Sequence, residues 1–304
     1  MKLLIIGSVA FDSIKTPFGK IDKALGGSAS YFSLAARFFT KPAMVGVVGN
    51  DFNQLDVFKK RGIDTSGISK VQGKTFHWAG EYSLDLNSRE TLKTELGVFA
   101  DFKPLLSATQ KQSQYVFLGN IHPKLQLDVL KQIERPKFVG LDTMNYWIES
   151  APADLKKVLK LVNILIINDS EARQFSKEHN LIKASKKILG IMNSPLHPSP
   201  STLIIKRGEY GLLMFQKNKI FNLPGYPLED VADPAGAGDS FAGGFMGYLS
   251  KADNTSWPKL KKACLTGSVM ASFCVEKLGT KKLQEIGKAE IWKRLKDFED
   301  LIKH

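Results

Sequence analysis

The segment DPAGAGDSFAGGF, residues 233–245, places small residues directly before an aspartate. The apolar run after Asp239 has small residues at helical spacing, which predicts a buried helix with residues 235–238 as the loop at its N-terminus. The first N–H groups of a helix have no partner within it and lie at the positive end of its dipole. Glycines let an anion approach these groups closely, so the loop is suited to the charge on a phosphoryl group.

Asp239 follows this loop at once, and two interpretations of its carboxylate are open. The carboxylate would repel a resting phosphate, but it could accept a proton from an alcohol that attacks a phosphoryl group held over the loop. Alternatively, Asp239 caps the helix and the glycines only form a turn. The segment is not a Walker A loop, because no Gly-Lys-Ser/Thr follows it.

The rest of the chain alternates short apolar runs with helical patterns, which predicts an α/β fold with a mostly parallel sheet. The predicted strands cover 2–9, 43–51, 115–120, 137–143, 163–169 and 202–208. One predicted helix follows Gly26, and others cover 57–63, 124–134, 153–161, 170–178 and 183–193. Polar residues mark the carboxyl ends of the strands: Asp12, Asn50, Asp51, Asn120, Asp142, Asn168 and Lys206. Ligands of open α/β sheets bind at these ends, so we expect the site there.

Two further segments predict a smaller sheet outside the main one. Residues 75–96 alternate and are rich in aromatic side chains, which favours a hairpin with a turn near Asn87-Ser88. The stretch after Asp12 has short strand patterns around Pro17 and Gly19. The segment SPLHPSPS, residues 194–201, is interpreted as a surface loop, because strand and helix patterns continue on both sides of it. We therefore expect a single domain over residues 1–304.

Composition narrows the choice of partners and compartment. The 304 residues are 43% hydrophobic and 24% charged, as is typical of globular proteins. The formal charge of +13 suits an anionic ligand such as a nucleotide, or only reflects a basic surface. No zinc spacing or aromatic-basic RNA signature occurs, so we expect no nucleic-acid partner. The apolar runs are short for a membrane span and the two cysteines imply no disulfide framework, so we expect no membrane partner and a reducing cytoplasm.

The opening segment resembles the second signature of the ribokinase-like (PfkB) carbohydrate kinases, which usually reads D-T-x-G-A-G-D. Four further motifs resemble that family, in a matching order: GSVAFD (7–12), LGGSASYFSLAA (25–36), NDSE (168–171) and KRGEYG (206–211). The resemblance covers nearly the whole chain. It implies a three-layer α/β/α ribokinase-like fold with a mostly parallel central sheet and a small β-sheet lid, formed by about 13–25 and 75–96.

The resemblance also implies roles for individual residues. The catalytic base matches Asp239, and the anion hole matches Gly236, Ala237 and Gly238. The residues expected to bind the acceptor are Asp12, Gly26, Gly27, Tyr31 and Asn50. The residues expected to bind the nucleotide are Asn168, Glu171, Lys206, Gly208, Gly211 and Gly279, with Glu171 reaching Mg²⁺ through water.

Simpler interpretations stay open for some of these residues. Asp12 could cap a turn, and Glu171 could be a first-turn acid favoured by the helix dipole. Lys206 could be a solvated charge at a strand end, while His77 and Trp78 are interpreted as packing within the lid. Two departures from the family pattern affect the substrate. Tyr31 stands where the family usually has an Asn that reads the sugar, and Pro234-Ala235 replaces a Thr-x pair.

These features predict an ATP-dependent kinase that transfers the γ-phosphoryl group, with Mg²⁺, to a hydroxyl of a sugar. The alternative is an adenosine-type nucleoside kinase of the same family, in which Tyr31 and the aromatic lid residues Phe76, Trp78 and Tyr82 would stack on a base. A non-catalytic sensor also stays open, whereas a dinucleotide-dependent oxidoreductase is disfavoured because GSVAFD lacks G-x-G-x-x-G. The acceptor, a homodimer through the lid and a role for a monovalent cation are left open.

Overall fold

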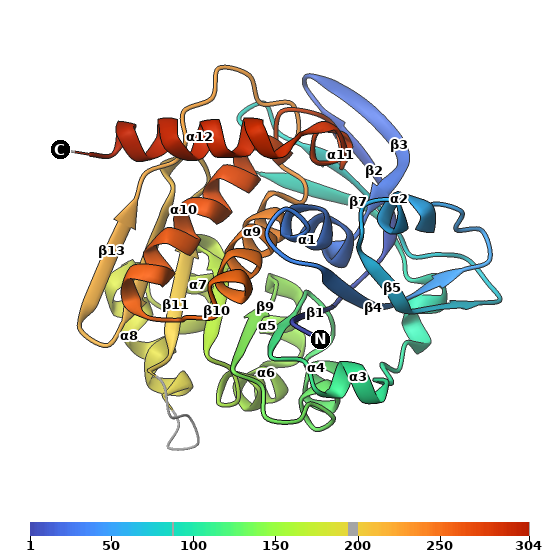
Figure 1. Cartoon of the computed structure of the whole chain (residues 1–304), viewed down its shortest axis with the longest axis horizontal. Coiled ribbons are helices and arrows are strands. Elements are labelled where there is room, and N and C mark those ends of the chain that lie inside the picture. The colour runs from blue at the N-terminus through green and yellow to red at the C-terminus, as the bar shows by residue number, and fades with distance from the viewer. Residues whose placement is uncertain (87, 194–199, 304) are drawn as a thin grey trace. The chain divides into compact units, whose positions relative to one another are not determined.

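The computed structural model describes residues 1–86, 88–193 and 200–303 (Figure 1). The chain divides into two compact units. The first unit contains Met1 and Lys103–Gly225, and the second contains Lys2–Phe102 and Tyr226–His304. Asn87 and most of SPLHPSPS lie outside the described residues, so the turn and the loop expected there stay predictions.

The first unit carries a sheet whose strands follow the order β13-β12-β11-β10-β9-β8. Four of these strands are parallel: β8 (Tyr115–Leu118), β9 (Phe138–Asp142), β10 (Ile164–Asn168) and β11 (Thr202–Lys206). They are apolar and buried almost throughout, as expected of strands covered on both faces, and they confirm the four strands predicted in this region. The antiparallel strands β12 (Leu212–Gln216) and β13 (Lys219–Leu223), which the sequence patterns above did not include, complete the sheet.

Four helices between the parallel strands of the first unit lie close to the predicted positions: α4 (Pro123–Leu130), α6 (Pro152–Leu159), α7 (Asp169–Ser176) and α8 (Leu181–Met192). The sequence patterns did not include α3 (Ala108–Lys111), which precedes β8, or α5 (Asn145–Ser150). A short 3₁₀ turn, η2 (Gly208–Tyr210), follows β11.

The second unit contains two sheets. The strands β1 (Leu3–Ile6), β4 (Pro42–Gly49) and β5 (Asp64–Val71) are parallel, in the order β1-β4-β5. The smaller sheet has the order β3-β2-β6-β7, with β2 (Ala10–Thr16), β3 (Gly19–Gly26), β6 (His77–Tyr82) and β7 (Arg89–Glu95). Two antiparallel hairpins, β2-β3 and β6-β7, are joined through the parallel pair β2-β6. This confirms the small sheet predicted from 13–25 and 75–96, and we call it the lid sheet.

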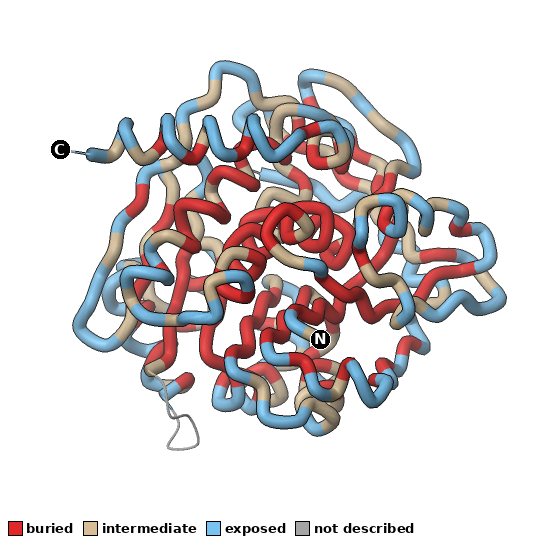
Figure 2. Tube along the Cα trace, viewed as in Figure 1, coloured by how far each residue is buried: buried red, intermediate tan, exposed pale blue. Residues whose placement is uncertain are grey.

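Two long helices and several shorter ones complete the second unit. They are α1 (Ser28–Ala36), α2 (Leu55–Lys59), the 3₁₀ turn η1 (Gly97–Asp101), α9 (Ala237–Ala252), α10 (Trp257–Cys274), α11 (Lys281–Glu285) and α12 (Lys288–Leu301). All of α1 and most of α9 are buried (Figure 2). Within the described part of the chain, no helix is long and apolar enough to cross a membrane.

Glycines allow α9 to pack closely against α1. A Cβ on Gly243 would lie 2.2 Å from the carbonyl oxygen of Phe32, and one on Gly247 would lie 3.1 Å from Cα of Ala36. The first distance leaves no room for a side chain, and the second would require α1 to shift by a few tenths of an ångström. The close approach fixes the middle of α9 relative to the second half of α1.

The structure corrects the position that we expected for Asp12. The predicted first strand ran over 2–9 with Asp12 at its carboxyl end, but β1 ends at Ile6 and Asp12 lies within β2 of the lid sheet. The chain leaves the main sheet early because Ser8 binds the start of α1. Its carbonyl accepts the N–H of Ala29 (3.0 Å) and its Oγ accepts the N–H of Ser28 (3.0 Å).

Candidate active site

Helix α9 begins at Ala237, with Gly236 as its N-cap residue. Gly236 has φ of +73°, in the left-handed region that favours glycine. The first turn therefore follows a glycine loop and presents backbone N–H groups at the positive end of the helix dipole. The predicted loop covered residues 235–238, but the structure places Ala237 and Gly238 in the first turn of α9 itself. The N–H of Ala237 donates to the carbonyl of Pro234 (3.2 Å), so an incoming anion would share that donor.

Asp239 is the third residue of α9, and its side chain is partly exposed. The helix begins with Gly236 as its N-cap, so Asp239 does not occupy the N-cap position that the simpler interpretation gave it. The dipole of α9 stabilises negative charge in this first turn. A carboxylate here can accept a proton without being the group that starts the helix.

Asp233 anchors the loop before α9, a role that the sequence patterns did not assign to it. Its side chain is buried, with Oδ1 accepting the N–H of Ala235 (2.8 Å) and Oδ2 accepting the N–H of Gly279 (2.7 Å). One carboxylate thus ties the loop at 233–236 to Gly279, which has φ of +64°. Burial raises the pKa of Asp233 to about 6, although both N–H donors oppose the rise. The only signal in the sequence was its place as the first residue of the signature.

Asp12, Gly26 and Gly27 lie together, as predicted. The Asp12 carboxylate accepts the N–H of Gly27 (3.4 Å), and a Cβ on Gly26 would lie 2.1 Å from the carboxyl group. Gly27 is the N-cap of α1 with φ of +90°. Asp12 is only 7% exposed, and this burial raises its pKa to about 7. The pKa places the Asp12 carboxyl between its protonated and ionised forms near neutral pH.

Tyr31 is the fourth residue of α1 and is buried, with 1% of its surface exposed. Its ring lies against Gly236, because a Cβ on that glycine would fall 2.2 Å from Cδ1 and 2.3 Å from Cε1 of Tyr31. The interpretation that Tyr31 stacks on a base requires an open ring face, which this buried ring does not offer. The remaining aromatic residues of that interpretation lie in the lid.

Aromatic and apolar side chains cover the inner part of the lid sheet. Ile14 and Tyr82 form a buried cluster with Ala235, the residue before Gly236, and Trp78 packs against it. The Arg89 guanidinium lies 5.5 Å from the Trp78 ring centre and lowers the pKa of Asp12, which opposes the effect of burial. Arg89 therefore acts electrostatically on the proposed acceptor site. Phe76 instead stacks on Phe99 of η1, with ring centres 5.5 Å apart.

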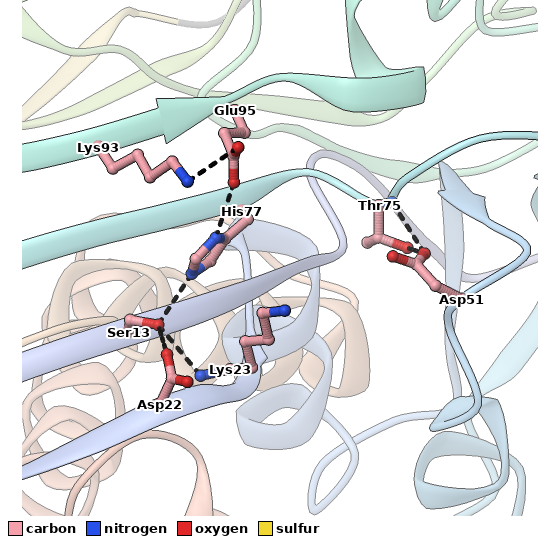
Figure 3. A network of polar contacts seen from close by, with 8 residues as sticks. All are labelled: Ser13, Asp22, Lys23, Asp51, Thr75, His77, Lys93 and Glu95. Atoms are coloured by element: carbon pink, nitrogen blue, oxygen red, sulfur yellow. Dashed lines mark hydrogen bonds and ion pairs between the residues drawn. The ribbon is translucent and has the colours of Figure 1, made fainter.

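A polar network joins all four strands of the lid sheet (Figure 3). The His77 ring lies 2.8 Å from Ser13 Oγ through Nε2 and 3.1 Å from a Glu95 oxygen through Nδ1. Ser13 Oγ donates to Asp22 and accepts the N–H of Lys23 (3.1 Å). A carboxylate only accepts, so Ser13 gives its proton to Asp22, and the His77 ring joins β2 to β7 through its two nitrogens. The arrangement agrees with the interpretation of His77 as lid packing.

Asn50 and Asp51 hold the loop that leads into β6. Asn50 Oδ1 accepts the N–H of Gly73 (3.3 Å), and Asp51 Oδ1 accepts both the N–H (2.9 Å) and the hydroxyl (2.6 Å) of Thr75 (Figure 3). The hydrogen bonds lower the pKa of Asp51 against the opposing effect of burial. Contact of Asn50 with an acceptor stays a prediction.

In the first unit, Asn168 and Glu171 form a reciprocal cap at the start of α7. Asn168 Oδ1 accepts the N–H of Glu171 (2.7 Å), and a Glu171 carboxylate oxygen accepts the N–H of Asn168 (2.8 Å). This capping box accounts for the N-x-x-E spacing by local structure alone. It also fixes both side chains at the carboxyl end of β10.

Lys206 ends β11 directly beside Asn168, its register partner on β10. Asp142 ends β9, the next strand in the sheet, and is buried. Burial raises the pKa of Asp142, while the charge of Lys206 opposes this rise. Three neighbouring strands thus place an amide, an ammonium and a carboxyl group at one edge, as the sequence predicted.

The glycines after β11 are required by the backbone itself. Gly208 has φ of +56° and Gly211 has φ of +79°. A Cβ on Gly211 would lie 2.0 Å from the carbonyl oxygen of Leu223 on the neighbouring strand. Their contact with a nucleotide stays a prediction, since the strand packing already explains Gly211.

The acids of the first unit fit a magnesium ion of the kind that nucleotides carry. Across the described residues, no group of three or more His, Cys, Asp or Glu side chains could hold a metal ion by itself. Nucleotide-bound Mg²⁺ takes most of its ligands from phosphate and water and needs one or two carboxylates from the protein. Asp142 ends β9, and Glu171 follows the neighbouring strand β10. Together they supply two carboxylates.

A family model described as "pfkB family carbohydrate kinase" matches residues 4–286. The chain belongs to the PfkB carbohydrate kinase family. A cytidine kinase of Thermococcus kodakarensis is 26% identical and aligns over 83% of this chain and 89% of its own length. The resemblance found in the signature segment is therefore confirmed over nearly the whole chain.

Two solved structures share the fold of this PfkB protein. The Burkholderia thailandensis nucleoside kinase in complex with inosine has a TM-score of 0.76 at 19% identity, covering 97% of this chain and 98% of the other. A putative ribokinase II from E. coli in complex with ATP and Mg²⁺ also has a TM-score of 0.76, at 17% identity, covering 97% and 99%. The predicted ribokinase-like fold, with a mostly parallel sheet and a small lid sheet, is confirmed.

Proposed function

We propose that this PfkB protein is an ATP-dependent kinase that phosphorylates a primary hydroxyl of a ribose-containing acceptor, with a nucleoside as first candidate and a free sugar as second. The observation that carries the proposal is the start of α9. There Asp239 lies in the first turn of a buried helix whose N-cap is the left-handed Gly236. A proton acceptor and a set of N–H donors then share one helix terminus.

Each group at this terminus has a distinct task in the transfer. Asp239 accepts the proton of the attacking hydroxyl. The N–H groups of residues 236–238, with the dipole of α9, stabilise the negative charge on the transferring phosphoryl group. Asp233 holds this loop in place through the N–H of Ala235. When bound, Mg·ATP supplies the γ-phosphoryl group and neutralises its oxygens.

The strand ends of the first unit are proposed to hold the nucleotide. Glu171 would reach Mg²⁺ through water, and Asn168 keeps its carboxylate oriented through the capping box. Lys206 ends a strand beside Asn168, and its positive charge would attract the phosphates of a nucleotide bound there. The remaining proposed nucleotide contacts are Gly208, Gly211 and Gly279.

The acceptor is proposed to bind the second unit through Asp12, Gly26 and Gly27. In its ionised form the Asp12 carboxylate accepts hydrogen bonds from the hydroxyls of a ribose. The lid favours a nucleoside, because Trp78 is only partly buried where it packs against the cluster of Ile14 and Tyr82, and its indole ring suits a base better than a second hydroxylated ring. The cytidine kinase and the inosine-bound nucleoside kinase support the same class of acceptor. The family description as carbohydrate kinases keeps the free sugar as second candidate.

Release of ADP from Mg·ATP, measured with a panel of nucleosides and sugars, tests the proposal. We expect turnover with at least one nucleoside, and a loss of about 10²–10⁴-fold in kcat for Asp239→Asn. Asp253→Asn is the matched control, because Asp253 lies at the other end of α9 in a left-handed conformation that asparagine accepts. Turnover only with free sugars would select the second candidate. No turnover by the wild type with any acceptor, despite binding of ATP, would favour a sensor.

We also propose that the two units form one kinase domain, because the family match spans residues of both. The lid sheet supports a homodimer: β7 is its edge strand, every residue of β7 is exposed, and Leu92 shows 56% of its surface. Light scattering of the wild type and Leu92→Lys tests this. A reducing cytoplasm is proposed because Cys264 and Cys274 are buried and lie ten residues apart on α10, too far apart for a disulfide bond between them.

A further inference from the structure

The ring of Tyr31 is the part of α1 that lies against the N-cap glycine of α9. A Cβ added to Gly236 would come within 2.2–2.4 Å of three ring atoms, Cδ1, Cε1 and Cγ. Such distances are far below van der Waals contact, so the ring already touches the backbone of Gly236. Gly236 has φ of +73°, and because glycine adopts positive and negative φ with similar ease, a contact from outside can select the left-handed conformation.

Tyr31 is itself held firmly. Its N–H donates to the carbonyl of Gly27 (3.2 Å) in the first turn of α1, and its side chain is 1% exposed. The next two turns of α1 are locked against α9, because Gly243 and Gly247 bring the two backbones together at Phe32 and Ala36. The ring therefore cannot move away from Gly236 without moving a close-packed helix pair.

The hydroxyl of Tyr31 does not explain this placement. It has no hydrogen-bond partner among the described residues, and burial followed by the charges of Asp12 and Asp233 raises its pKa well above the ordinary value. A buried hydroxyl without a partner is unfavourable, so the hydroxyl does not stabilise the ring where it lies. The contact between the ring and Gly236 is therefore the feature that accounts for the position of Tyr31.

We propose that Tyr31 is a positioning residue: its ring holds Gly236 in the left-handed conformation and so fixes the N–H groups at the start of α9 for phosphoryl transfer. This inference rests on the proposed function of the α9 terminus. At this position the chain carries an aromatic ring that packs on Gly236, the residue before the first turn of α9. The consequence is that Tyr31 acts on kcat, while the nucleotide is bound elsewhere.

Two variants separate the ring from the hydroxyl in the ADP-release assay. Tyr31→Phe keeps the ring and should keep kcat within about threefold of the wild type. Tyr31→Leu keeps an apolar side chain but loses the flat ring, and it should lower kcat at least tenfold while the KM for Mg·ATP changes less than threefold. A tenfold loss of kcat in Tyr31→Phe, or full kcat in a folded Tyr31→Leu, would overturn the inference. Turnover by the wild type keeps this outcome distinct from failure of the proposed function.

A double-mutant cycle gives a readout that does not depend on activity. Gly236→Ala forces a methyl group into the ring, whereas Tyr31→Ala removes the ring. If the contact is real, the two losses in the urea midpoint are not additive, and the double variant unfolds at a higher urea concentration than their sum predicts. Additive losses would refute the contact. Gly190→Ala combined with Tyr31→Ala is the control pair and should be additive, because a Cβ added to Gly190 of α8 meets nothing within 4 Å.

Discussion

Replacing Asp12 with asparagine should stabilise the folded chain at neutral pH and impair binding of the acceptor. Asp12 is 7% exposed, and burial raises its pKa from 3.8 to about 7. An ionised carboxylate in this position has lost most of its water and receives one long hydrogen bond, from the N–H of Gly27 at 3.4 Å. Asparagine has the same shape and can accept the same bond without the charge.

The magnitude follows from linkage between protonation and folding. The folded chain binds the proton of Asp12 more tightly than the unfolded chain, so the resulting stability is complete below about pH 4 and is lost as the pH rises through 7. The interval from 3.8 to about 7 corresponds to about 4 kcal/mol at about 1.4 kcal/mol per pH unit. About 2–3 kcal/mol of this should disappear between pH 5 and pH 7.5.

Urea unfolding of both proteins from pH 5 to pH 8.5 measures the effect. The free energy of unfolding of the wild type should fall relative to that of Asp12→Asn as the pH rises, until the variant is the more stable protein above pH 7. Burial also raises the pKa of Asp233 to about 6. Asp233 is present in both proteins, so the difference between them reports Asp12 together with the contribution that the charge of Asp233 makes to the pKa of Asp12. The kcat/KM for the acceptor should fall at least tenfold in the variant.

Asp22→Asn is the matched control on the neighbouring strand of the lid sheet. The Ser13 hydroxyl lowers the pKa of Asp22, which is exposed, so its stability contribution has the opposite sign and is lost as the pH falls. The free energy of unfolding of Asp22→Asn should therefore not rise relative to that of the wild type at high pH. A constant difference between the wild type and Asp12→Asn across the pH range would refute the reasoning, because it would mean that Asp12 does not titrate as a buried carboxyl group.

Two further outcomes are expected from residues that hold the site. Asp233→Ala removes two charge-assisted bonds to backbone N–H groups, so the free energy of unfolding should fall by about 3–5 kcal/mol in urea titration; a loss below 1 kcal/mol would mean that Ala235 and Gly279 find other acceptors. His77→Gln breaks the network across the lid strands, so backbone amides of β6 and β7 should exchange faster with deuterium while those of α9 do not; equal protection in the variant would show that the network does not hold the lid.

Local patterns in the sequence predicted the start of α9 and the buried parallel strands. The glycines before Asp239 and the apolar run after it belong to one contiguous segment, so no contact with a distant residue was needed to predict the helix start. The strands β8 to β11 are apolar at nearly every position because both faces are covered, so a run of apolar residues was sufficient. The edge strand β7 has no buried residue and was predicted only through its aromatic partner β6 in the hairpin.

The position of Asp12 could not be predicted in the same way. Its strand pattern continues smoothly from the first apolar run, and what ends β1 is a contact with a distant residue. The hydroxyl and carbonyl of Ser8 bind the start of α1, twenty residues further along the chain. Tyr31 failed as a base-stacking residue for the same reason, since its burial depends on how closely α1 and α9 approach.

The carboxylate of Asp233 shows how the signature segment connects to the lid. Its two oxygens join the loop before α9 to Gly279, and the next residue, Thr280, donates its hydroxyl to the carbonyl of Leu25 in β3 (3.3 Å). From the other side, the Thr16 hydroxyl of β2 donates to the carbonyl of Ala232 (2.9 Å). The lid hairpin and the loop before α9 are therefore bound to the same short segments.

The contribution of Asp233 to folding stability depends on pH. Burial raises the pKa of Asp233 to about 6, so the stability that the protonated form contributes is lost as the pH rises through 6, while the ionised form is the better acceptor for the two N–H groups. Above about pH 6 the folded chain thus has less stability from Asp233, although the ionised carboxylate then accepts its two N–H groups most strongly. The buried charge of Asp233 therefore keeps the loop in place at a cost in folding stability that grows as the pH rises, as expected of residues that position a reaction.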